Sequence, residues 1–296
     1  MLFRSYHANT MFVYQFRTFV FSLELYQSTH TARLLRWDRA GVVVTEAFNF
    51  VEKPELLVEF LRRFDQLSPD RRGWDPTVQP ATHAEAQLLN DAVIDYLNKV
   101  VLYKVPHLWD IRHCIDQWAP AWKVRLDDGS GADPAEVIVR KPAFIHPIYC
   151  GSGMIERYGL LLGENRLVFM RDDWATYGSS RMPAVDVYNQ VFKDGGVRHV
   201  PKALYADYVR AGPDRKKILT WTQFNLFKGL AWPITRVPWV PQMYTRLVQD
   251  ISYPLRFVRS SKELVKSIRG VLVGMSPFIT LNDHSLILFA SHTGRL

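Results

Sequence analysis

The stretch that decides the fold is Thr31-Ala-Arg-Leu-Leu-Arg-Trp-Asp-Arg-Ala-Gly41, followed directly by Val42-Val43-Val44. A charge-dense run ending at Arg39 meets an apolar, β-branched run at the Ala40-Gly41 turn. Because β-branched residues favour strands and glycine favours tight turns, the stretch predicts two short strands joined at this turn. Asp38 lies between two arginines. Its position suits a catalytic carboxylate or, as we favour, a salt-bridge cluster that holds the turn.

Strands and then helices are expected on either side of this turn. Residues 12 to 26 are rich in aromatic and β-branched residues, and the polar segment Gln27–His30 follows them, so residues 12 to 50 predict a meander of strands. Pro54 suits the first position of a helix, because its missing N–H costs nothing there. Apolar residues at helical spacing continue that helix to Phe64, and a second helix is expected from Ala84 to Leu102.

The second half of the chain also alternates strands with helices. Turn formers fill Asp127–Pro134 between two strand-like segments, residues 149 to 170 predict hairpins, and Pro183–Phe192 predicts a helix. Residues 219 to 239, rich in aromatic residues and prolines, predict an irregular insertion, and Ser260–Glu263 matches a capping box. The predicted fold class is therefore α+β in two parts, with a boundary between residues 140 and 145.

Composition and charge bear on three classes of protein, namely nucleic-acid-binding, metal-binding and membrane-spanning proteins. The chain has 296 residues and a formal net charge of +8, but its longest basic cluster, Arg215-Lys216-Lys217, favours a solvated surface over a nucleic-acid interface. Cys114 and Cys150 lack metal-ligand spacing and the histidines are scattered, so no metal site is predicted. The cysteine usage favours a reducing intracellular compartment, cytoplasmic or nuclear. No apolar run reaches the roughly 18 residues of a membrane span.

Four segments together carry a resemblance to a known family. Arg33-Leu-Leu-Arg-Trp-Asp-Arg-Ala-Gly41, Phe60-Leu-Arg-Arg-Phe64, Gly73-Trp-Asp-Pro-Thr77 and Val248-Gln-Asp-Ile-Ser252 resemble motifs of the fungal-type protein kinases. The resemblance covers residues 12 to 272. It implies an N-terminal α+β domain over residues 1–140, a kinase-like small lobe with the first large-lobe helix over residues 145–272, and a divergent tail over residues 273–296. For full-length relatives it also implies ATP, Mg²⁺ and a Ser/Thr protein substrate.

The resemblance places a degraded glycine-rich loop at Cys150–Tyr158, with Gly151 and Gly153 as its first two glycines. In kinases such a loop covers the phosphates of ATP. Glu156 stands near the third glycine position and brings a negative charge towards a triphosphate. The alternative is an ordinary β-turn that contains two glycines.

Arg171 stands where the resemblance implies the strand lysine that positions the phosphates. Arginine keeps the charge but replaces a compact ammonium with a longer planar fork. Asp186 is then the candidate partner on the following helix, one methylene shorter than glutamate. The two residues are expected either to pair as a structural brace or to be solvated independently, with Arg171 on the surface of an edge strand.

Gln249, Asp250 and Ile251 stand where the resemblance implies the hinge between kinase lobes. Their backbone groups would then face an adenine. A buried strand that ends in a turn explains the same residues equally well.

The motifs that carry phosphotransfer in kinases have no counterpart in this sequence. It contains no His-Arg-Asp, Asp-Phe-Gly or Ala-Pro-Glu, so no catalytic residue is predicted and most of the large lobe is expected to be missing. We therefore expect a family member without competent phosphotransfer that binds ATP and Mg²⁺ weakly or not at all. Whether the protein is an enzyme stays open.

The alternative function is a non-catalytic protein-interaction module or a pseudokinase-like scaffold. The expected partner is a protein in either case, as substrate or as binding partner. Apolar surface of a small lobe without its large lobe also predicts self-association.

Overall fold

A computed structural model gives the fold of the chain. It describes residues 2–101, 111, 119–127, 133–145, 152–176, 182–193, 203–212, 214–222 and 241–251, with residues 261, 262, 265, 268 and 269. The predicted insertion at residues 219 to 239 and the capping box at residues 260 to 263 lie largely outside the described residues.

The described residues form four α-helices and a short 3₁₀ helix. The α-helices are α1 (Leu2–Tyr14), α2 (Pro54–Asp65), α3 (His83–Val101) and α5 (Ala184–Lys193), and the 3₁₀ helix is Asp70–Arg72. The strands are β1 (Val20–Tyr26), β2 (Thr31–Asp38), β3 (Gly41–Val44), β4 (Phe48–Asn49), β5 (Val78–Pro80), β6 (Trp122–Leu126), β7 (Ala135–Val139), β8 (Phe144–Ile145), β9 (Ile155–Leu161), β10 (Arg166–Thr176), β11 (Ala203–Tyr208), β12 (Arg210–Ala211), β13 (Lys216–Lys217) and β14 (Gln242–Asp250). The paired strands are antiparallel, so the α+β prediction is confirmed.

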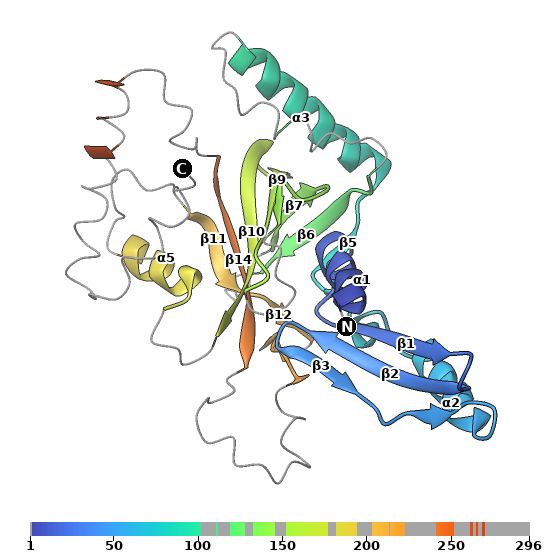
Figure 1. Ribbon diagram of the computed structural model, residues 1–296. Coiled ribbons are helices and arrows are strands. Elements are labelled where there is room, and N and C mark those ends of the chain that lie inside the picture. Colours follow the sequence, from blue (N-terminus) through green and yellow to red (C-terminus); the bar gives the residue numbers. More distant parts are fainter. Residues whose placement is uncertain are drawn as a thin grey trace.

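The N-terminal sheet has the order β1-β2-β3, and β4 also pairs with β2. Helix α1 covers one face, where Ala8 and Phe12 pack against Val20 and Trp37. Helix α2 covers the opposite face, where Phe60 and Phe64 contact the ring of Phe21. Figure 1 shows α1 lying between this sheet and the larger one.

The strand prediction for residues 12 to 14 was wrong, because these residues end α1. Met11 and Phe12 recur at helical spacing after Ala8 and bury an apolar stripe against the N-terminal sheet. Aromatic content alone favoured a strand there, and the packing of this stripe overrides that local preference. The turn at Ala40-Gly41, the helix beginning at Pro54 and the helix near residues 84 to 102 are confirmed.

The large sheet has eight strands, in the order β11-β14-β10-β9-β7-β6-β5 with β8 paired to β9. Strand β7 pairs with β9 through Val137–Leu161, Ile138–Leu160 and Val139–Gly159. This pairing crosses the expected boundary between residues 140 and 145. Strands from both sides of that boundary therefore share one hydrogen-bonded sheet.

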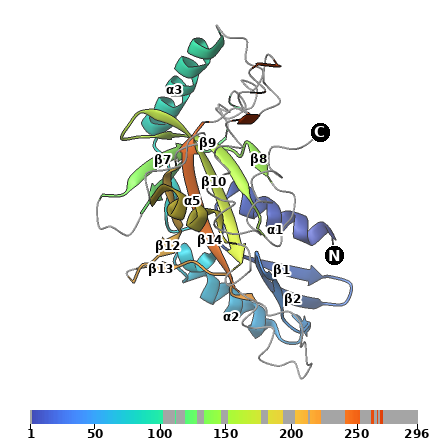
Figure 2. The same ribbon diagram turned by 90° about the vertical axis from the view of Figure 1, so that its left-hand side faces the viewer.

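Helices α3 and α5 lie on the same face of the large sheet. Leu89 and Val93 of α3 pack on Ile138 and Leu160, and Val185 of α5 packs on Met243. Figure 2 shows α5 in front of β10 and β14. We call this the helical face. The opposite face holds a second apolar cluster and meets the N-terminal part of the chain through Phe16.

A network of buried charges lies on that opposite face. The guanidinium of Arg246 donates to Asp172 at 2.7 Å, to Asp75 at 3.0 Å and to the hydroxyls of Thr77 and Tyr244, both at 2.9 Å. Burial works to lower the pKa of Arg246, and the nearby Asp172, Tyr244 and Asp75 outweigh it, so the pKa lies well above the ordinary value. Arg246 therefore carries its charge inside the protein.

Asp172 also serves a second buried arginine. Arg157 donates to Asp172 at 3.3 Å and to the carbonyl of Val13 at 2.7 Å, and its guanidinium lies 4.0 Å from the centre of the Phe16 ring. The side chains of Arg157 and Asp172 are 1% and 4% exposed, so water does little to screen them. Losing one member of such a group leaves the others as uncompensated buried charges.

Asp172→Asn is expected to lower the free energy of unfolding by about 3–5 kcal/mol, because two buried guanidinium groups then share no carboxylate. Urea unfolding followed by tryptophan fluorescence measures the change. Asp95→Asn is the control, since Asp95 pairs with Lys99 at 2.6 Å on an exposed helix surface and its loss should not move the midpoint. Equal midpoints for the two variants would contradict the structural role given to Asp172.

Candidate functional site

The glycine-rich segment lies in a hairpin between β8 and β9. Phe144 pairs with Glu156 and Ile145 with Ile155, and Ser152 to Met154 lead into β9. Gly151 lies outside the described residues. The contacts of Gly153, the described glycine of this segment, indicate what surrounds it.

Gly153 makes room for Arg39, an arginine of the Arg33–Gly41 motif. Its backbone has a φ of 50°, and a Cβ atom at this position would lie 2.5–2.7 Å from the guanidinium of Arg39. Arg39 is 2% exposed, lies 4.7 Å from the centre of the Phe12 ring and donates to Asn9 at 3.4 Å. The missing side chain at Gly153 thus accommodates a protein guanidinium.

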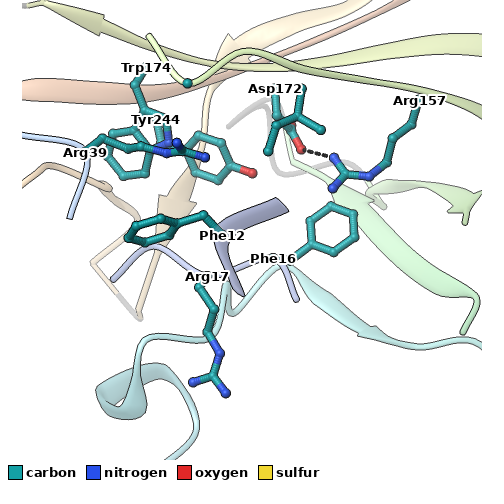
Figure 3. Close-up of a pocket in the computed structure, with 10 residues that line it drawn as sticks. Phe12, Phe16, Arg17, Arg39, Arg157, Asp172, Trp174 and Tyr244 are labelled. Atoms are coloured by element: carbon teal, nitrogen blue, oxygen red, sulfur yellow. Dashed lines mark hydrogen bonds and ion pairs between the residues drawn. The ribbon is translucent and has the colours of Figure 1, made fainter. Parts of the chain in front are cut away.

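A small cavity lies beside this contact, on the face opposite the helical face. Its lining includes Phe12, Phe16, Arg39, Tyr244 and Asp172, and Figure 3 shows their side chains around it. The cavity measures about 10 Å³, which is about the space that one water molecule needs. It has no room for a nucleotide.

Successive side chains of β10 point to opposite faces of the sheet. Asp172 points to the face opposite the helices, so Arg171 lies on the helical face. Its guanidinium is 3.7 Å from Asp173, and Glu156 stands directly across from it on β9. Burial raises the pKa of Glu156, Arg171 lowers it and Asp173 raises it further. Among the described residues, the carboxylates of Asp173 and Glu156 therefore lie near the guanidinium of Arg171.

Asp186 of α5 accepts a hydrogen bond from the hydroxyl of Tyr208. Among the ion pairs of the described residues, Arg171 pairs with Asp173 and not with Asp186. The α5 side chain near Arg171 is that of Tyr188, whose hydroxyl donates to Gln249 at 3.1 Å. Burial raises the pKa of Tyr188, and the charge of Arg171 acts against that rise. Sequence analysis missed Tyr188, although its spacing of three from the buried Val185 indicates the covered face of the helix.

The three hinge candidates are engaged within the fold. Gln249 pairs with Phe169 on one side and Ala203 on the other, and Asp250 pairs with Val168. The side chain of Asp250 also forms an ion pair with Arg166. Ile251 packs against the apolar cluster under α3. These contacts fit a strand inside a sheet.

The structure thus brings Arg171, Tyr188 and Gln249 together on the helical face. It places the Gly153 contact with Arg39 on the opposite face, next to Trp174 and Tyr244. The interpretation of Asp38 as a structural carboxylate is confirmed. Its oxygens accept from Arg36 at 3.1 Å and from the backbone amides of residues 40, 221 and 222 at 2.7–2.9 Å.

Metal-ligating side chains do not gather in the part of the chain that the structure describes, where no group of three or more His, Cys, Asp or Glu residues could hold an ion. Within the same residues, no helix is long and apolar enough to cross a membrane.

A scan against protein-family models and searches of curated proteins and of solved structures found no match to this chain. Membership of the fungal-type protein kinase family therefore remains a hypothesis that depends on the motifs quoted above.

Gly153→Ala is expected to destabilise the protein by about 2 kcal/mol or more, through a left-handed φ and a clash with the buried Arg39. In an Arg39→Ala background the clash disappears, so a double-mutant cycle should give a coupling of about 1 kcal/mol or more. Gly163→Ala is the control, because its Cβ would have no atom within 4 Å. Additive effects of the Gly153 and Arg39 changes would contradict the contact.

Glu156→Gln is expected to raise the melting temperature at pH 7, because burial disfavours the ionised carboxylate. A folded-state pKa above the ordinary 4.5 gives stability that is present below pH 4.5 and is lost as pH rises through the folded pKa. The melting temperatures of the variant and wild type should therefore converge towards acid pH. Glu52→Gln, at an exposed position, is the control. A gain that grows towards acid pH is the opposite of this expectation.

Proposed function

We propose that this chain is a non-catalytic, protein-binding member of the fungal-type protein kinase family, and that any nucleotide binding it retains is weak. One observation carries the proposal. Gly153 and Arg171, which the resemblance assigns to the phosphates of ATP, have their contacts on opposite faces of the large sheet. A single triphosphate cannot use both without a rearrangement of the β8–β9 hairpin.

The charges around Arg171 support the same proposal. Kinases neutralise the β- and γ-phosphates with a lysine and with metal ions. Here Asp173 lies 3.7 Å from Arg171 and Glu156 stands opposite it on β9, so these three described side chains together carry no net positive charge when both carboxylates are ionised. An incoming phosphate would meet two like charges beside one opposite charge.

The sequence lacks the remaining parts of the chemistry. Its 296 residues contain neither the His-Arg-Asp motif, which supplies the base, nor the Asp-Phe-Gly motif, which supplies a metal ligand. ATP, Mg²⁺ and a Ser/Thr substrate remain what the resemblance implies for full-length relatives. For this chain we propose a protein as binding partner.

The test is a phosphotransfer assay on purified wild type and Arg171→Lys. With radiolabelled ATP, Mg²⁺ and Mn²⁺, both are expected to incorporate no more phosphate than a heat-killed control, because a lysine at one position restores neither a base nor a metal ligand. Calorimetric titration with Mg²⁺ and ATP should give a Kd no tighter than about 1 mM.

Two results would overturn the proposal. One is incorporation that survives the removal of co-purifying kinases. The other is a micromolar Kd for ATP that Arg171→Ala weakens and the exposed control Glu52→Gln does not.

A further inference from the structure

Strand β1 forms the end of the N-terminal sheet, and no strand of the described residues pairs with its outer edge. Its only strand partner among the described residues is β2, and Figure 1 shows it along the border of the sheet. Just before it, the amide of Thr18 donates to the carbonyl of Gly73 at 2.8 Å, so residues near Gly73 cover the edge up to that point. Beyond that point, no described strand pairs with the outer edge of β1.

Hydrogen bonds elsewhere in the sheet show which backbone groups point outwards. The amide of Thr45 donates to the carbonyl of Leu34 at 3.0 Å, so the polar backbone groups of Leu34 face β3. Leu34 pairs with Leu23, and paired residues of an antiparallel ladder turn their groups towards each other or both away. Leu23 therefore turns its N–H and C=O away from β2. Phe21 and Leu25, two residues to either side, do the same.

Nothing in the strand protects this edge against pairing. Natural edge strands are commonly guarded by lysine, proline or a bulge. The sequence Val-Phe-Ser-Leu-Glu-Leu-Tyr contains no lysine, proline or glycine and a single charge, Glu24, and its pairing with β2 runs without a shift. The edge is a template for a further antiparallel strand.

The sequence of β1 matches itself across a two-fold axis. We propose that β1 pairs with β1 of a second copy of this chain, antiparallel and centred on Leu23. Leu23 then lies opposite Leu23 of the second copy, and Phe21 lies opposite Leu25. These are the residues whose backbone groups point outwards, so they exchange about six hydrogen bonds across the axis.

Side chains on both faces agree with this register. Leu25 is 55% exposed in the single chain, and pairing would bring it next to Phe21 of the second copy, beside the Phe60–Phe64 cluster of that copy's α2. On the other face Glu24 lies opposite Ser22, so like charges do not face each other. Because this register places apolar side chains opposite apolar side chains and keeps the two Glu24 carboxylates apart, a second copy is the occupant that we propose for the edge. This surface lies apart from the small-lobe surface that sequence analysis indicated for self-association.

The oligomeric state of the full chain tests the proposal. Sedimentation equilibrium from about 1 to 100 μM should show a reversible dimer. Leu25→Lys should weaken dimerisation at least about tenfold, because each dimer loses two buried leucines and gains charge at its edge. Val58→Lys is the matched control, since Val58 of α2 is 61% exposed, and it should leave the dimer unchanged. Equal melting temperatures of the variants at low concentration exclude misfolding as the cause.

A symmetric cross-link tests the register. In a background with Cys114→Ser and Cys150→Ser, Leu23→Cys should form a disulfide-linked dimer, because opposed Cα atoms in such a pair lie about 5.5 Å apart. Val58→Cys should not cross-link. A monomer at all concentrations, aggregation without a discrete dimer, or a dimer that resists Leu25→Lys and is not trapped by Leu23→Cys each overturns the proposal.

Discussion

The buried guanidinium of Arg246 is the interaction on which the rest of the structure depends. It joins β14 to β10 through Asp172 and to the Gly73–Thr77 segment through Asp75. Asp172 in turn holds Arg157 of β9, and Arg157 binds the carbonyl of Val13 near the end of α1. One connected group of charges thus ties three strands to the N-terminal part of the chain. Each charge is tolerable inside the protein only because its partners are present.

A second tie joins the two sheets at the Ala40-Gly41 turn. Asp38 accepts from the amides of residues 221 and 222, while its neighbour Arg39 fills the space beside Gly153. The Gly73–Thr77 motif contributes Asp75 to the Arg246 network. Two of the motifs that carry the kinase resemblance therefore hold the architecture together. In this structure the residues of these two motifs join the sheets, and their contacts give no evidence of phosphate binding.

Local signals made part of this fold predictable, and long-range pairing hid the rest. Pro54 and the apolar spacing after it specify α2, and glycine at position 41 specifies the turn, because each acts within a few residues. The pairing of β7 with β9 joins segments about twenty residues apart, and the sequence of neither segment indicates which strand it pairs with. The structural role of Asp38 was predictable, because the arginines close to it in the sequence indicated a salt-bridge cluster. The contact between Gly153 and Arg39 was not predictable from the sequence, since the two residues are far apart in the chain.

The face on which Arg171 lies follows from the residue after it. Side chains alternate along β10, so once Asp172 is committed to Arg157 and Arg246, Arg171 must turn to the helical face. The same alternation directs Ile155 and Arg157 of β9 to the other face and leaves Glu156 opposite Arg171. The buried network that stabilises the sheet therefore also separates the two phosphate-binding candidates, and a nucleotide-binding site that used both would require β9 or β10 to shift by one residue and break that network.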